Sequence, residues 1–174
     1  DPFVFLQEIE SLESQGFDSS HILISDCAHL IMPSHIKLDV LQEERLANNK
    51  IGTTKRGIGP CYADKYTRIG LRVGDLLDFE TFKKRLASTL AIKNEQITKL
   101  YHEEPFDYDQ LVEQFREVRE KLQKRIIDSV TLVNDALDSN QHVLFEGAQA
   151  AMLDINYGTY PYVTSSSPTS AGVC

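Results

Sequence analysis

The sequence predicts an α/β fold, namely part of a mostly parallel sheet with a largely helical middle section. Short apolar runs typical of buried strands occur at residues 21–25 and 142–145. Between them, at roughly 79–139, apolar residues recur at intervals of three and four, the spacing of amphipathic helices. No internal repeat or linker divides the chain, so we expect residues 1–174 to belong to a single domain.

The first helix is expected over residues 3–15. Its apolar side chains have helical spacing, at Phe5, Ile9 and Leu12. Gly16 follows at a position where helices commonly end with glycine.

A strand and a second helix are expected next. The run HILIS at 21–25 is short, apolar and rich in β-branched residues, as buried strands are. Pro33 is expected to end the extended stretch. Ser34 is a candidate N-cap for a short helix that continues to about Ala47.

The middle of the chain has the clearest periodicity. After Asp78, four apolar residues share one side of a helix: Phe79, Phe82, Leu86 and Leu90. A longer stripe then steps without interruption by threes and fours: Leu111, Phe115, Val118, Leu122, Ile126, Val130, Val133 and Leu137. Asp107 and Gln110 have the spacing of a capping box at its start. The stripe predicts one long amphipathic helix whose charged residues face water.

Composition excludes several classes of function. A net charge of -8 argues against a general binder of nucleic acids or membrane surfaces, which present basic faces. No apolar run has the length of a membrane span, and no signal peptide opens the chain. The cysteines Cys27, Cys61 and Cys174 are far apart, which fits a reduced, cytoplasmic setting without disulfides. Neither they nor the histidines have metal-ligand spacing, so no metal site is expected.

The stretch IGTTKRGIGPCYADKYTRIG, residues 51–70, has the residue types of an anion site. Its glycines allow close backbone approach, its threonines donate hydrogen bonds, and Lys65 and Arg68 supply positive charge. The spacing is not that of a Walker A loop. A solvated surface loop with turn glycines is the alternative interpretation.

A second polar segment follows the strand predicted at 142–145. Gln149 comes directly after it, where open α/β sheets keep their ligand crevice, and its amide could recognise a base edge or an oxo group. Thr164 and the serines 165–167 could donate hydrogen bonds to phosphate. They could equally be turn residues near the prolines of this segment.

Taken together, these segments resemble one family, the adenylosuccinate synthetases. GIGPCYADKYTR, residues 57–68, is similar to the lysine signature of that family, and IGTT, RIGLRVGDLL, LFEGAQ and LDINYGTYPYVTSS also match. The resemblance implies GTP-dependent joining of inosine monophosphate (IMP) and L-aspartate, which gives adenylosuccinate, GDP and phosphate in AMP biosynthesis. In this family GTP first phosphorylates the 6-oxygen of IMP, and Mg²⁺ neutralises the charge that moves.

The resemblance also implies roles for individual residues. Thr54, Arg68, Gln149 and Thr164 would contact IMP, the two threonines through its 5′-phosphate. Gln149 would also act in catalysis near the 6-oxygen, and Lys65 would support the site electrostatically. Arg68 matches an arginine that reaches the IMP site of a neighbouring subunit, which implies a homodimer.

Parts of the family pattern are absent from this sequence. The chain begins at Asp1 without methionine, and it lacks the N-terminal phosphate loop and the C-terminal half of the family. The main ligands of GTP and Mg²⁺ belong to those missing parts, so we expect a central fragment that is inactive alone. Lys55 stands where the family commonly has glycine, and Ala150-Ala151 replaces Gly-Thr.

An alternative from another class stays open at this point. The apolar stripe from Leu111 to Leu137 and the interface-type Arg68 also suit a non-catalytic module for dimerisation or nucleotide binding.

Overall fold

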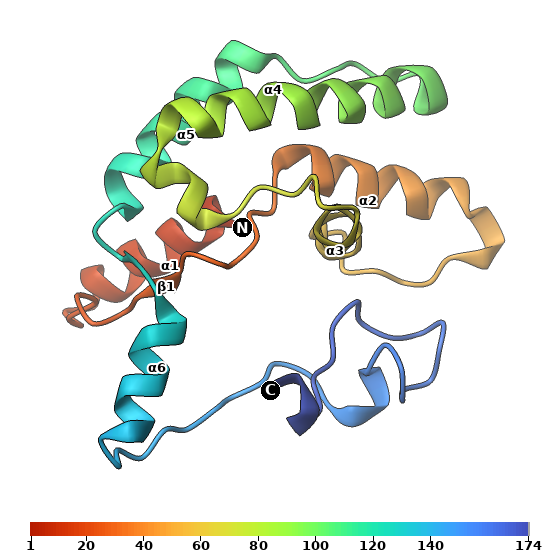
Figure 1. The fold of residues 1–174 in the computed structure, drawn as a ribbon. Helices are drawn as coiled ribbons and strands as arrows, with labels where there is room; N and C mark the ends of the chain where they lie inside the picture. Colours follow the sequence, from red (N-terminus) through yellow and green to blue (C-terminus); the bar gives the residue numbers. More distant parts are fainter. Residues whose placement is uncertain (174) are drawn as a thin grey trace.

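The computed structural model describes residues 1–173, which form a series of helices and a small parallel sheet (Figure 1). In chain order the elements are α1 (Pro2–Ser14), β1 (Ile24–Ser25), α2 (Pro33–Arg45), α3 (Ile58–Thr67), α4 (Phe79–Glu95), α5 (Tyr108–Leu122), β2 (Ile126–Ile127) and α6 (Ser129–Asp138). A π-helical turn, Gln96–Leu100, extends α4, and short 3₁₀ turns lie at Ala47–Asn49, Val73–Leu77, Ala151–Leu153 and Ser170–Val173. The fold class is α/β, as predicted.

The sheet consists of β1 and β2. They pair in parallel, with Ile24 opposite Ile126 and Ser25 opposite Ile127. The strand predicted at 21–25 therefore forms only in its last two residues. β2 was not predicted, because its two isoleucines are too short a run to stand out inside a helical pattern.

The prediction of one helix along residues 111–137 is wrong. α5 ends at Leu122, and β2 follows after a turn. A new helix, α6, then begins after Asp128, whose carboxylate caps it by accepting a hydrogen bond from the amide of Thr131 at 3.1 Å. The capping carboxylate is a local start signal that the apolar stripe concealed.

Arg125 explains why the chain leaves the helix here. Its guanidinium donates hydrogen bonds to the backbone carbonyls of Ser19 and Ile22, the latter at 3.2 Å. These contacts hold the segment beside β1, where Ile126 is buried as a strand residue. Ile126 has the spacing of a helical residue in the sequence, but the tertiary contacts of Arg125 place it in a strand.

Residues 142–145 do not form the predicted strand. Leu144 is 91% exposed, and no other segment among residues 1–173 pairs with this run. A parallel strand needs hydrogen-bonding neighbours and covering helices, which an apolar sequence cannot supply by itself. The run is extended and lies in the stretch that leaves α6 in Figure 1.

Three predicted helix boundaries are confirmed, and all depend on local signals. Gly16, at φ 86°, follows the end of α1. The carboxylate of Asp78 caps α4 by accepting from the amide of Thr81 at 3.1 Å. Asp107 caps α5 in the same way, from the amide of Gln110 at 2.7 Å.

The start of α2 differs from the prediction. Pro33 is its first residue, and the N-cap position is held by Met32 rather than by Ser34. The amide of Met32 donates to Nδ1 of His35 at 3.0 Å, so a histidine side chain supplies the cap. The helix ends at Arg45, slightly before Ala47.

The hydrophobic core lies between α4 and α5, with α1 packed against it. The rings of Phe82 and Phe115 are fully buried, with centroids 5.3 Å apart. Phe3 of α1 meets Phe115 edge to face at 5.5 Å. This core fixes α4, and α4 in turn contributes a side chain to the charged network described next.

A buried network built on Asp64 joins three helices. Its Oδ2 accepts from Nε2 of His35 in α2 at 2.9 Å, and its Oδ1 pairs with Nζ of Lys93 in α4. All three side chains are at most 8% exposed. Burial acts to raise the pKa of Asp64, but the hydrogen bonds from His35 and Lys93 hold that pKa below its ordinary value of 3.8.

We expect Asp64→Asn to destabilise the protein by about 3–5 kcal/mol at neutral pH, because it leaves Lys93 buried without a counter-charge. Urea denaturation measures the loss, and Asp135→Asn, an exposed site in α6, is the control. The lowered pKa makes this contribution present above about pH 4 and lost as the pH falls through the folded-state pKa. The difference from wild type should therefore shrink in acid. Equal free energies of unfolding at pH 7 would contradict this role of Asp64.

Candidate functional site

The polar stretch at residues 51–70 is half loop and half helix. Residues 51–57 connect α2 to α3, and α3 itself was not predicted. Pro60 lies in the first turn of α3, where its missing N–H costs no helical hydrogen bond. Figure 1 shows this loop passing from the end of α2 back to α3.

Gly57 allows α3 to begin directly against α2. Its φ is 77°, in the left-handed region. A Cβ at this position would lie 2.8 Å from the amide nitrogen of Ile36 and 2.9 Å from the carbonyl carbon of His35. No side chain fits there, so this glycine of the signature is a packing requirement.

The side chains predicted to bind an anion are exposed on this loop and helix. Thr54 lies in the loop, Lys65 in α3, and Arg68 ends α3 in the left-handed conformation, at φ 65°. The Nζ atom of Lys65 lies over the rings of Tyr62 and Tyr66, at 5.4 and 5.7 Å from their centroids. These rings hold the lysine without neutralising its charge.

The cations of this stretch have no acidic partners among residues 1–173. None of the ion pairs of that region includes Lys55, Arg56, Lys65 or Arg68. Positive charge therefore accumulates here in a chain whose net charge is -8. Lys55 has φ 55°, a conformation that glycine adopts without strain, which agrees with the glycine that the family resemblance places there.

The hydroxyl-rich tail meets the start of α3. Ser165 Oγ lies 3.7 Å from a Cβ built on Gly59, so the two segments are neighbours although they are far apart in sequence. Thr164 is half-buried beside Ser165, and its amide donates to the carbonyl of Leu153 at 2.9 Å. The fold thus brings Ser165, in the loop that also carries Thr164, to the start of the helix that carries Lys65.

Asp154 organises the loop that carries Thr164. It is fully buried, and its carboxylate accepts hydrogen bonds from the amides of Asn156 at 2.8 Å and Tyr157 at 3.1 Å and from the hydroxyl of Thr169. These hydrogen bonds hold the pKa of Asp154 below its ordinary value, and the bond from the Asn156 amide has the largest effect. The carboxylate therefore stays ionised.

Gln149 lies on an exposed turn. Nearby, a Cβ on Gly147 would lie 3.7 Å from the carbonyl oxygen of Pro168, which ties the turn to the tail. The hydrogen bonds of residues 1–173 include none from the side chain of Gln149. The structure therefore brings the loop that carries Thr164 to the start of α3, whereas Gln149 lies on an exposed turn.

A cavity of about 320 Å³ separates α3 from the loop that follows β1. Lys65 and Tyr62 line it from α3, and Cys27 and His29 line it from the loop. It lies just beyond the carboxyl end of the strand, where ligand crevices of α/β sheets occur. His29 and Tyr62 were not predicted to belong here, because only the tertiary fold brings two short segments without a motif together.

The electrostatics of this cavity favour anions. Burial lowers the pKa of His29, and the neighbouring cations Arg72, Lys65 and Arg85 lower it further. Burial also raises the pKa of the Cys61 thiol to about 11, so this cysteine is not a nucleophile near neutral pH. The wall thus combines the positive charge of Lys65 with a neutral imidazole at His29 and a protonated thiol at Cys61.

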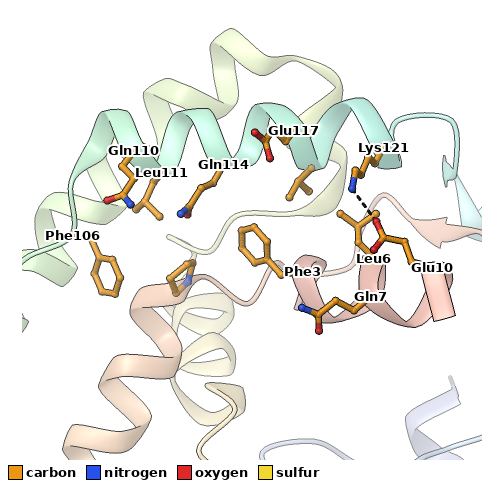
Figure 2. Close-up of a pocket in the computed structure, with 12 residues that line it drawn as sticks. Phe3, Leu6, Gln7, Glu10, Phe106, Gln110, Leu111, Gln114, Glu117 and Lys121 are labelled. Atoms are coloured by element: carbon orange, nitrogen blue, oxygen red, sulfur yellow. Dashed lines mark hydrogen bonds and ion pairs between the residues drawn. The ribbon is translucent and has the colours of Figure 1, made fainter.

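A larger cavity of about 510 Å³ lies elsewhere, between α1 and α5. Figure 2 shows its apolar wall, including Phe3 and Phe106, and the ion pair between Lys121 and Glu10 at 2.9 Å that spans the two helices. No residue predicted to bind substrate lines it. Its size alone is not an indication of the functional site.

Within residues 1–173, no group of three histidine, cysteine or acidic side chains could hold a metal ion. In the same part of the chain, no helix combines the length and hydrophobicity that crossing a bilayer requires.

Comparison with known proteins identifies the family. The family model described as adenylosuccinate synthetase matches residues 1–174. The chain is 56% identical over 173 residues to an adenylosuccinate synthetase of Fusobacterium nucleatum, and 48% identical over 174 residues to that of Brachyspira hyodysenteriae. These alignments cover 99% and 100% of the chain but 41% of each relative.

A solved structure agrees with the sequence matches. The fully ligated adenylosuccinate synthetase from Plasmodium falciparum superposes with a TM-score of 0.84 at 42% identity, covering 96% of this chain and 39% of that protein. The chain thus spans about two fifths of the length of the relatives that it matches. Its full-length family match, its sequence identity and its shared fold together place it in the adenylosuccinate synthetase family.

Proposed function

We propose that this chain is the central part of an adenylosuccinate synthetase, and that the whole protein uses GTP to join IMP and L-aspartate, which gives adenylosuccinate, GDP and phosphate. The observation that carries the proposal is the family match along the entire chain, with the signature residues on α3. The whole protein would act in AMP biosynthesis, in the cytoplasm.

The described residues would form part of the IMP site. Thr54 and Thr164 would donate hydrogen bonds from their hydroxyls to the 5′-phosphate, and Lys65 would supply electrostatic support. The proximity of Ser165 to Gly59 supports this arrangement, because it brings the tail to α3. The unpaired cations of residues 55–68 would attract the anion locally, as a concave basic patch does.

Arg68 and Gln149 would act at the borders of the site. Arg68 is exposed at the end of α3, a suitable position for reaching the IMP site of a second subunit in a homodimer. Gln149 would orient the 6-oxygen of IMP, a role that requires the exposed turn to move toward the nucleotide or to be placed by other parts of the protein.

GTP and Mg²⁺ belong to the proposed reaction, but residues 1–173 do not provide a site that fits Mg²⁺. Magnesium favours carboxylate oxygens and phosphates, and residues 1–173 offer no cluster of acidic ligands. We therefore assign these groups to other parts of the protein and derive no step for them here.

A second candidate is a non-catalytic module for dimerisation or nucleotide binding. Apolar side chains on α6 favour it, since Val130, Leu132 and Leu137 are about half exposed or more, at 61%, 50% and 48%. The same exposure is expected if other parts of a synthetase cover α6. A correctly folded whole protein that self-associates without consuming IMP in the presence of GTP and aspartate would favour the module.

In the whole protein, Arg68→Leu should raise the KM for IMP about 10- to 100-fold, because a charge-assisted phosphate contact is worth about 1.5–3 kcal/mol. Folding should be unaffected, since the side chain is exposed. The matched control is Arg116→Leu, an exposed arginine of α5 that pairs with Glu113. Steady-state kinetics with varied IMP measure the effect, and an unchanged KM would refute the role of Arg68.

Mixed dimers test whether Arg68 acts across the interface. At an IMP concentration below the wild-type KM, Arg68→Leu and Gln149→Ala subunits should each be nearly inactive alone. Random mixing should restore about a quarter of wild-type activity, because half of the dimers are mixed and each of those has one intact site. Activity that stays at the level of the separate variants would show that Arg68 serves its own subunit.

A further inference from the structure

α2 has a buried polar stripe where a helix of this kind normally carries apolar residues. His35, Asp39 and Glu43 are spaced by four, so they lie on one face, and they are only 1%, 4% and 3% exposed. Buried carboxylates are costly unless they are hydrogen-bonded. The partners of the two carboxylates therefore indicate what the stripe does.

Both carboxylates bind backbone amides of the loop that carries Thr54. Glu43 uses both oxygens: Oε1 accepts from the amide of Ile51 at 3.2 Å, and Oε2 from that of Gly52 at 3.1 Å. Asp39 Oδ2 accepts from the amide of Gly57 at 2.9 Å. The side chains of α2 thus hydrogen-bond to the loop backbone at its beginning and at its end.

Within the described residues, the segment 51–56 has little other hydrogen bonding. Among residues 1–173, no backbone–backbone hydrogen bond involves residues 51–56 outside helices and strands. The remaining bond is local, from the amide of Lys55 to the hydroxyl of Thr53 at 3.4 Å. The two carboxylates of α2 are therefore the principal tethers of an otherwise exposed segment.

Two of the amides that these carboxylates bind belong to glycines in the left-handed backbone conformation. Gly52 and Gly57 have φ values of 83° and 77°, both left-handed. In such a conformation the backbone turns sharply, and Thr53, Thr54, Lys55 and Arg56 are presented between two fixed points. A hydroxyl and two cations held in this way need less ordering when an anion binds.

We propose that Asp39 and Glu43 are positioning residues that preset the loop 51–57, and so the hydroxyl of Thr54, for a phosphate monoester. The inference rests on the proposed function, in which that monoester is the 5′-phosphate of IMP. Neither carboxylate touches the ligand. They act through the amides of Ile51, Gly52 and Gly57, which they hold in place.

Glu43→Gln in the whole protein tests the proposal. Glutamine has nearly the same shape but only one accepting oxygen, so one of the two amides loses its partner. We expect the KM for IMP to rise about tenfold, with kcat and the KM for GTP changed less than about twofold. Glu44→Gln, its exposed neighbour on α2, is the matched control and should leave all three constants unchanged.

A double-mutant cycle separates positioning from general stability. If Glu43 acts through the hydroxyl of Thr54, then Glu43→Gln should have little further effect on the KM for IMP in a Thr54→Val background. The full tenfold effect in that background would overturn the proposal. So would a Glu43→Gln enzyme that is less stable to heat but has a normal KM for IMP.

Asp39 provides a second, independent pair of variants should Glu43→Gln fail to fold. Asp39 uses a single oxygen, so Asp39→Asn can retain the bond to Gly57, whereas Asp39→Ala cannot. The KM for IMP should therefore rise in the alanine variant and be largely rescued in the asparagine variant. Equal values for the two variants would contradict the proposal.

Amide hydrogen exchange tests the tether without any activity. In the whole protein without ligand, the amides of Gly52 and Gly57 should be protected, and Glu43→Gln should accelerate exchange at Ile51 or Gly52 but not at Gly57. If IMP is not a substrate at all, this result still decides whether α2 holds the loop. Fast exchange of these amides in the wild type would overturn the proposal even if IMP turnover is normal.

Discussion

The arrangement of the site depends on one buried carboxylate, Asp64, and its bonds to His35 and Lys93. Two charges taken out of water are tolerated only with good geometry and full hydrogen bonding, so the three helices that carry these groups have little freedom relative to one another. His35 also caps α2 through Met32. Because Lys65 follows Asp64 directly and Arg68 lies one turn later, fixing Asp64 fixes the face of α3 that carries both cations.

Acidic and basic side chains have different roles in this molecule. Five of its acidic side chains are used within the fold: Asp78, Asp107 and Asp128 cap helices, and Asp39 and Glu43 accept hydrogen bonds from loop amides. The cations between Lys55 and Arg68 have no such partners among residues 1–173. A net negative protein can therefore keep a local site for an anion, since the effect of a charge in water fades beyond about 10 Å.

Much of the candidate site was predictable because its signals are continuous in sequence. The signature from Gly57 to Arg68 and the hydroxyl-rich tail around Thr164 stand out as polar segments, and the fold brings Ser165 to Gly59. His29, Asp39 and Glu43 were not predicted. They lie in elements whose sequences look ordinary, and their importance comes only from what the folded chain places against them.

The sequence by itself determined the helix boundaries marked by Gly16, Asp78 and Asp107 and the polar segments, because a carboxylate or glycine at a helix end acts within a few residues of itself. The tertiary structure alone decided where the long apolar stripe breaks and which strands form. Arg125 reaches the carbonyls of Ser19 and Ile22 only in the folded chain, and residues 142–145 lack a pairing neighbour. Strand pairing and side-chain anchors join distant segments, so no local pattern can specify them.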